Sequence, residues 1–214
     1  RTITSHFDEI FDALPKVSFE NADEEYESSY EGSETDTENQ TDNGANNDNG
    51  STTDNNNIEI LKNNPNRKNL VLKIYTLNTD STRLHGLFKE FKRISVQAYP
   101  NAIAASLRVF LDLAVLNYIR REGLESEMQR HYSRGLRDIQ LKYRIEYIKT
   151  NKLSGNVQRI AIKLLDENQQ YSLDVLNGFM HSQDTHYMSK QNLNSFWDFL
   201  FPLFEFLLDI RENV

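Results

Sequence analysis

Residues 99–123, YPNAIAASLRVFLDLAVLNYIRREG, form the segment that most constrains the fold of this chain. Apolar residues recur at helical spacing along one broad face, and others cover much of the opposite side. Pro100 suits a first helical turn, and Gly123 suits the left-handed residue that follows a helix end. Because such a helix must be surrounded by others, the segment predicts a central helix. Its length of about 20 residues and the charges of Arg108 and Asp112 argue against a membrane span.

Further stretches of helical spacing lie on both sides of this segment, and together they predict an all-α bundle of five or six helices. The expected helices are 84–94, a long basic helix over 125–150, 156–166, a turn or two over 173–180, and 190–208. Hydroxyls suited to N-capping stand at Ser81, with Asp80 as the alternative, at Ser172 and at Ser189. We expect Pro202 to kink the last helix, and residues 69–77 to form a short extended segment that leads into the bundle.

The first 57 residues differ in composition from the rest of the chain. Residues 17–57 hold twelve Asp or Glu and no Lys or Arg, so they cannot bury enough apolar surface to offset the entropy of ordering. We expect a short helix over 1–16 that ends an upstream domain, a disordered acidic linker over 17–57, and the helical bundle over 58–214. The linker is either a plain spacer or a tail that competes with nucleic acid. Because the chain starts at Arg1 without methionine, we expect it to be a piece of a longer protein.

The formal net charge of −8 conceals a basic middle. Residues 62–163 hold 20 Lys or Arg against 8 Asp or Glu, and a basic face of this kind binds DNA or RNA phosphates without sequence preference. The alternative is a solvated face whose charge balances the acidic linker. Candidate phosphate contacts are Arg130, Arg134, Arg137, Lys142, Arg144, Lys149 and Lys152, and the inner stripe of the same helix is expected at Met128, Tyr132, Leu136, Ile139, Tyr143 and Tyr147.

Several classes of chemistry are excluded by what the sequence lacks. It has no cysteine, so disulfide frameworks, cysteine nucleophiles and cysteine-bound zinc are ruled out, and a reducing, cytoplasmic setting is expected. A glycine-rich phosphate loop, GxSxG and HExxH are also absent. His181 and His186 flank Asp184 in a polar stretch, but such sets often occur without zinc, so we expect neither a metal nor a cofactor.

Two pairs of polar residues, each one helical turn apart, form the candidate site. In LNGFMH, residues 176–181, the amide of Asn177 and the imidazole of His181 share a helix face and could converge on a phosphate. The alternative is a histidine that fastens a loop. Arg108 and Asp112 either neutralise each other and brace the loop before His181, or leave Arg108 to line a pocket beside it.

Four segments in this order, LFKEFKRISVQAYPNA, SLRVFLDLAVLNYI, LNGFMHS and NLNSFWDFLFPLFEFLLDI, resemble the C-terminal helical region of ParB-domain-containing proteins from bacterial and phage-defence contexts. That region is similar to the HEPN superfamily, so the resemblance, which covers about residues 67–212, implies a HEPN-like helical bundle. HEPN ribonucleases carry an Arg and, a turn or two further on, a His, often with a polar residue after the Arg, at a dimer interface. Asn177 and His181 match the polar residue and the His, whereas Leu176 stands where the Arg is expected.

The resemblance implies a chain that acts by association rather than catalysis. We expect a non-catalytic dimerisation and interaction module of a ParB-like protein, linked to anti-phage defence, with DNA or RNA as a partner and no membrane. The alternative is a metal-independent HEPN-type ribonuclease toxin that uses Asn177 and His181, with Arg108 in place of the missing motif Arg.

Because the last helix carries apolar residues on more than one face, it predicts a homodimer interface at Phe196, Trp197, Leu200 and Phe204.

Overall fold

Helices make up most of residues 64–181 and 189–213, the part of the chain that the computed structural model describes. In this part seven α-helices follow each other: α4 (Thr82–Arg93), α5 (Pro100–Arg121), α6 (Glu125–Tyr132), α7 (Leu141–Asn151), α8 (Gly155–Leu165), α9 (Leu173–His181) and α10 (Lys190–Leu207). A 3-10 turn, η2 (Leu136–Asp138), and strands β1 (Tyr75–Asn78) and β2 (Asp209–Glu212) complete it. The mainly helical character is confirmed. The predictions for 1–16 and for the linker lie outside the described residues.

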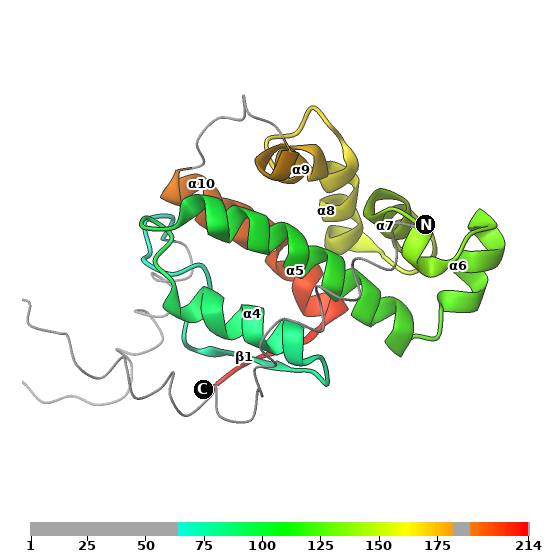
Figure 1. The fold of residues 1–214 in the computed structure, drawn as a ribbon, viewed down its shortest axis with the longest axis horizontal. Coiled ribbons are helices and arrows are strands. Elements are labelled where there is room, and N and C mark those ends of the chain that lie inside the picture. The colour runs from blue at the N-terminus through cyan, green and yellow to red at the C-terminus, as the bar shows by residue number, and fades with distance from the viewer. Residues whose placement is uncertain (1–63, 182–188, 214) are drawn as a thin grey trace, which may run out of the picture. The chain divides into compact units, whose positions relative to one another are not determined.

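Helix α5 lies in the middle of the bundle, where it contacts α4, α7, α9 and α10 (Figure 1). It begins at Pro100, whose missing N–H is not needed there, and Gly123 beyond its end has a φ of +66°. The predicted inner face is buried along its whole length, at Ile103, Leu107, Phe110, Leu111, Ala114, Val115 and Tyr118. On the other side Ala105, Val109, Leu113 and Leu116 are partly exposed. The central helix is therefore confirmed, although other elements cover one broad side of it rather than its whole circumference.

By length and composition alone, α5 is apolar enough to cross a membrane, with a mean hydropathy of 1.6 over its most apolar 18 residues. Half of that stretch is buried inside the bundle. Since the buried core helix of a soluble protein passes the same test, this property is weak evidence for a membrane span.

The predicted long helix over 125–150 is wrong, because the structure divides it into α6, η2 and α7. Helix α6 ends at Tyr132, since Ser133 takes a left-handed conformation with φ 51° and ψ 38°. Extended backbone at Gly135 then leads into η2. This division is also why the count of five or six helices is too low. It changes the inner stripe: Tyr143 is 46% exposed, and the buried residues of α7 are Leu141, Arg144, Ile145 and Ile148.

Helix α10 supplies much of the aromatic core. The rings of Phe110, Trp197 and Phe204 pack together with centroids 5.0 to 5.9 Å apart. All four residues predicted for a homodimer interface are inside this core: Phe196, Leu200 and Phe204 are 0% exposed and Trp197 is 2% exposed. The prediction that these residues form the interface is wrong, because α5, α8 and β2 contact the several apolar faces of α10 within one chain.

Strands β1 and β2 pair antiparallel, with Tyr75 opposite Glu212 and Asn78 opposite Asp209. The sequence predicts an extended segment within 69–77, and β1 covers the end of it. It does not predict the partner, which lies 137 residues away for the Tyr75–Glu212 pair. The two strands join the beginning of the described bundle to its end.

Serine side chains cap three helices as predicted. The Oγ atoms of Ser81, Ser172 and Ser189 accept hydrogen bonds from backbone N–H groups three residues ahead, at 3.3, 3.3 and 3.1 Å. Ser81, not Asp80, is the cap of α4. Pro202 lies inside α10, and the kink expected there stays a prediction.

Candidate functional site

Four polar side chains meet where α7 and α9 each contact α5, and we call Arg108, Asp112, Arg144 and Asn177 the arginine cluster. Arg108 Nη1 lies 3.5 Å from Asp112 Oδ2, and Arg144 Nη1 lies 2.7 Å from Asp112 Oδ1. Arg108 Nε donates a hydrogen bond to Asn177 Oδ1 at 2.8 Å. The structure thus brings together two of the three residues predicted for the alternative ribonuclease site.

Arg144 belongs to this cluster, although the sequence analysis assigns it to the exposed basic face. Its side chain is only 7% exposed, and its Nε donates to the backbone oxygen of Ile139 at 2.9 Å. Burial lowers the pKa of Arg144, and the nearby Asp112 carboxylate opposes that effect. The prediction that Arg144 contacts phosphates on an exposed face is therefore wrong, because the guanidinium is committed to groups of its own chain.

The cluster holds two guanidinium groups for one carboxylate. The Arg108 side chain is 17% exposed and that of Asp112 32% exposed, so one side of the cluster reaches solvent. Asp112 lies closer to Arg144 than to Arg108, its predicted partner, while Arg108 holds α9 through Asn177. His181 follows Asn177 by one turn at the end of α9, but its side chain lies outside the described residues. The same holds for Asp184 and His186.

A second group of side chains carries most of the exposed positive charge. Residues 130–163 contain nine Lys or Arg against two Asp or Glu. Among them Lys149 pairs with Glu146 at 2.6 Å. The others, apart from Arg144, are exposed, and none of them forms an ion pair within the described part of the chain. We call these residues the basic surface: Arg130, Arg134, Arg137, Lys142, Lys152, Arg159 and Lys163.

Aromatic side chains join α6 to α7 beside these cations. The rings of His131 and Tyr132 lie 4.6 Å apart, and those of Tyr132 and Tyr143 lie 5.8 Å apart. The Tyr132 hydroxyl donates to the backbone oxygen of Tyr143 at 2.9 Å. Burial raises the pKa of the Tyr132 hydroxyl, as does the nearby Glu146 carboxylate. The ring of Tyr143 remains 46% exposed and is able to stack on a nucleobase.

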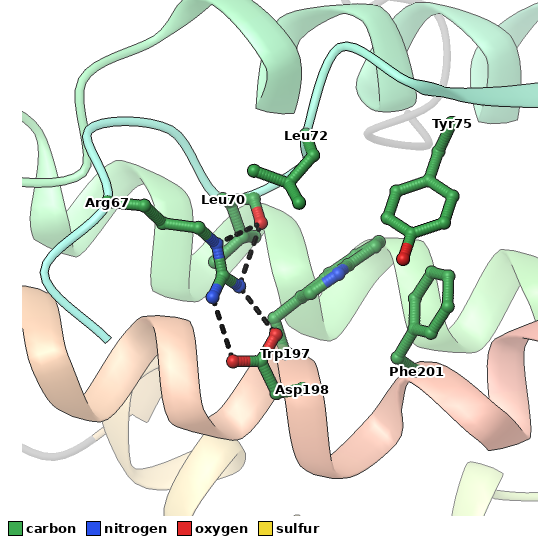
Figure 2. Close-up of a pocket in the computed structure, with 7 residues that line it drawn as sticks. All are labelled: Arg67, Leu70, Leu72, Tyr75, Trp197, Asp198 and Phe201. Atoms are coloured by element: carbon green, nitrogen blue, oxygen red, sulfur yellow. Dashed lines mark hydrogen bonds and ion pairs between the residues drawn. The ribbon is translucent and has the colours of Figure 1, made fainter. Parts of the chain in front are cut away.

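A third site, which the sequence does not predict, lies between the segment before β1 and helix α10. Arg67 forms a bidentate pair with Asp198, at 2.7 and 2.8 Å, and also donates to the backbone oxygens of Leu70 and Asn194. A pocket of about 190 Å³ opens next to this pair (Figure 2). We call it the aromatic pocket, and it is lined by Arg67, Leu70, Leu72, Tyr75, Trp197, Asp198 and Phe201.

No local pattern could have shown this pocket, since Arg67 and Asp198 are 131 residues apart in the sequence. Burial raises the pKa of the Asp198 carboxyl, while the Arg67 guanidinium opposes that shift. The partner of a buried arginine is a tertiary property. The only sign in the sequence is an Asp in the middle of the aromatic run of the last helix.

The chain matches no protein-family model, no curated protein and no solved structure. Within residues 64–181 and 189–213 no group of three or more His, Asp or Glu side chains is placed to hold a metal ion. The resemblance to ParB-domain-containing and HEPN proteins therefore stays a prediction.

Proposed function

We propose that this chain is a non-catalytic helical module that binds DNA or RNA through phosphate contacts of the basic surface. The observation that carries the proposal is the set of seven exposed cations in residues 130–163, which have no carboxylate partner among the described residues. A protein with a formal net charge of −8 that keeps so much unpaired positive charge in one region attracts polyanions to that region.

The proposal predicts how binding depends on salt. Each phosphate that a Lys or Arg neutralises releases condensed counterions, so affinity falls as salt rises. Seven cations neutralise at most seven phosphates, which limits the slope of log affinity against log salt to about −6 on duplex DNA. The exposed Tyr143 ring adds stacking on unpaired bases, which favours single-stranded RNA or DNA over a duplex.

Fluorescence anisotropy with a labelled oligonucleotide tests the proposal. We expect the double charge reversal Arg134→Glu with Arg137→Glu to weaken binding by about tenfold or more at about 50 mM salt, where screening is weak. Arg83→Glu with Arg93→Glu is the matched control, since both residues are exposed on α4 and the change in net charge is the same. Equal losses in the two variants, or no binding by the wild type, would contradict the basic surface as the binding face.

We also propose that the bundle is HEPN-like and belongs to a ParB-like protein of anti-phage defence, acting in the cytoplasm as a homodimer. The order of the four resembling segments supports this assignment, because they include the buried central helix and the aromatic last helix. The dimer interface lies elsewhere than at the four core residues of α10. The full open reading frame with its neighbours tests the assignment, and sedimentation at micromolar concentration tests the dimer.

A ribonuclease is the second candidate, and the hydrogen bond from Arg108 to Asn177 favours it. Arg108 bonds Asn177, which precedes His181 by one helical turn in α9, and its guanidinium would supply the charge of the motif Arg, whose place in this chain is taken by Leu176. Incubating wild-type chain and His181→Ala with total RNA separates the two functions. If the wild-type chain cleaves RNA and His181→Ala does not, the chain is a ribonuclease and the proposal of a non-catalytic module is wrong.

A further inference from the structure

We infer that a pocket next to the start of β1 binds a single-chain amphiphile, which has an anionic head and an apolar chain of about ten carbons. Residues 67–74, all except Leu70, line this pocket, and we call it the lysine pocket. The inference is independent of nucleic-acid binding, because none of the pocket residues belongs to the basic surface. It follows from the fixed backbone of the pocket, from its volume and apolar walls, and from two lysines that lack a counter-charge.

The backbone around the lysine pocket is held by α4 and by the residues that follow it. The Val71 N–H donates to the backbone oxygen of Phe91 at 3.2 Å, and the side-chain amide of Asn69 donates to the backbone oxygen of Ile94 at 3.1 Å. At the beginning of the segment, Arg67 is fixed to α10 through its bonds to Asp198. The pocket is therefore formed before a ligand binds, so little conformational entropy is lost on binding.

The volume and the walls of the lysine pocket set the apolar part of the ligand. The pocket measures about 310 Å³. Apolar cavities of about 150 Å³ admit benzene, so about twice that volume accommodates a chain of about ten carbons. Val71 is buried, and Leu72 and Ile74 are partly buried against the core, so the walls offer apolar contacts to an alkyl chain.

The charge of the segment sets the head of the ligand. Residues 64–79 contain Arg67, Lys68 and Lys73 and no Asp or Glu. Asp198 neutralises Arg67. Lys68 and Lys73 are exposed, and their side chains form no ion pair or hydrogen bond within the part of the chain that the structure describes. Two ammonium groups without a counter-charge thus border the pocket, and they attract an anionic head and repel a cationic one.

Lys92 on α4 adds to this positive charge. Its Nζ donates to the backbone oxygen of Lys73 at 3.4 Å. Burial lowers the pKa of the Lys92 ammonium, and no carboxylate among the described residues opposes that shift. A carboxylate bound in the lysine pocket supplies the negative charge that this region of the chain lacks.

Isothermal titration calorimetry of the full chain with hexanoate, octanoate, decanoate and dodecanoate, each below its micelle concentration, tests the volume and the apolar walls. Burial of one methylene group changes an affinity by a factor of about three to four. We therefore expect the affinity to rise about tenfold for each two methylenes up to decanoate, and not to rise further for dodecanoate, whose chain is longer than the pocket accommodates.

Octanol has the chain length of octanoate without its charge, so it tests the head. At about 50 mM salt, where screening is weak, we expect octanoate to bind the wild type about fivefold more tightly than octanol does. Lys68→Gln with Lys73→Gln should weaken octanoate binding about fivefold and leave octanol binding unchanged. Lys142→Gln with Lys152→Gln is the matched control, since both residues are exposed, lie outside the pocket and give the same change in net charge.

Nuclear Overhauser contacts between the octanoate chain and the methyl groups of Leu72 and Ile74 in the wild type should locate the ligand in the pocket. The inference would be overturned if decanoate showed no saturable binding, if affinity did not depend on chain length, or if octanoate and octanol bound equally well. Equal losses in the two double variants, or contacts of the octanoate chain only with other methyl groups, would overturn it too.

Discussion

The carboxylate of Asp112 lies between two guanidinium groups, 2.7 Å from Arg144 Nη1 and 3.5 Å from Arg108 Nη1. Replacing it with asparagine keeps the shape of the side chain but removes the acidic group of the arginine cluster. Two positive charges then remain close together, and Arg144, with its side chain 7% exposed, loses its ionic partner. We expect Asp112→Asn to be one of the most destabilising polar substitutions in the bundle.

The magnitude follows from burial. Removing one partner of a fully buried ion pair costs about 3–5 kcal/mol. The side chains of Asp112 and Arg108 are 32% and 17% exposed, so solvent screens part of the repulsion, and we expect a loss of about 2–3 kcal/mol in the free energy of unfolding. Arg144→Met leaves Arg108 as a partner for Asp112 and should cost less, about 1–2 kcal/mol.

Urea unfolding followed by the helical circular-dichroism signal measures these losses in the free energy of unfolding. The double variant of Asp112 and Arg144 measures the interaction energy between the two side chains. Since Asp112→Asn with Arg144→Met leaves only one cation in the cluster, its loss should be smaller than the sum of the single losses by about 1–2 kcal/mol. Glu146→Gln is the control: it breaks an equally short pair, 2.6 Å, whose members are 22% and 48% exposed, and should cost less than about 0.5 kcal/mol.

Additive losses would refute this reasoning. If the double variant lost the sum of the two single losses to within about 0.5 kcal/mol, Asp112 and Arg144 would not interact in the folded chain. If Asp112→Asn lowered the free energy of unfolding no more than Glu146→Gln does, burial would not strengthen the ion pairs of the arginine cluster.

Three further outcomes are expected. Deleting residues 17–57 changes the formal net charge from −8 to +4, because the segment holds twelve acidic and no basic residues, so the affinity for nucleic acid measured by anisotropy should rise several-fold. Gly123→Ala should lower the free energy of unfolding by about 1–2 kcal/mol because φ is +66° there, whereas Gly86→Ala in α4 should raise it by about 0.5–1 kcal/mol, both read from thermal unfolding. The hydrogen bond from Arg211 lowers the pKa of the Asp209 carboxyl below its ordinary value of 3.8. The ionised carboxylate therefore stabilises the folded chain above pH 3.8, and this stabilisation is lost as the pH falls through the lowered pKa of the folded state. The difference in unfolding midpoint between wild type and Asp209→Asn should therefore be present at neutral pH and vanish once the carboxyl is protonated in the folded chain.

Features set by short-range chemistry could be predicted from the sequence. Pro100, Gly123 and the capping serines act within one helical turn, so the ends of α4, α5, α9 and α10 follow from a few neighbouring residues. The break at Ser133 is short-range too, but serine takes a left-handed conformation rarely, and helical spacing continues across it. A pattern of apolar residues therefore predicted one helix where there are two.

Features that depend on distant partners could not be predicted. Arg144 stands in a run of exposed cations, and only the approach of α5 turns it into a buried partner of Asp112. In the same way, apolar residues around α10 indicate that it is covered on several sides, but not whether the cover comes from a second copy or from the same chain. Arg108 and Asn177, which are hydrogen-bonded, lie 69 residues apart in the sequence. Sequence analysis brought these two residues together only in the alternative ribonuclease site.

The Arg67 contacts and the β1–β2 pair also determine how the bundle responds to mechanical force. Tyr75 and Glu212 stand opposite each other at adjoining ends of the two strands, so tension that pulled on them directly would open the strand hydrogen bonds one after another. Arg67 precedes β1, and its bidentate pair with Asp198 and its bond to the Asn194 carbonyl fix it to α10. Tension that enters through residue 64 therefore reaches α10 through a charged anchor before it reaches the strands.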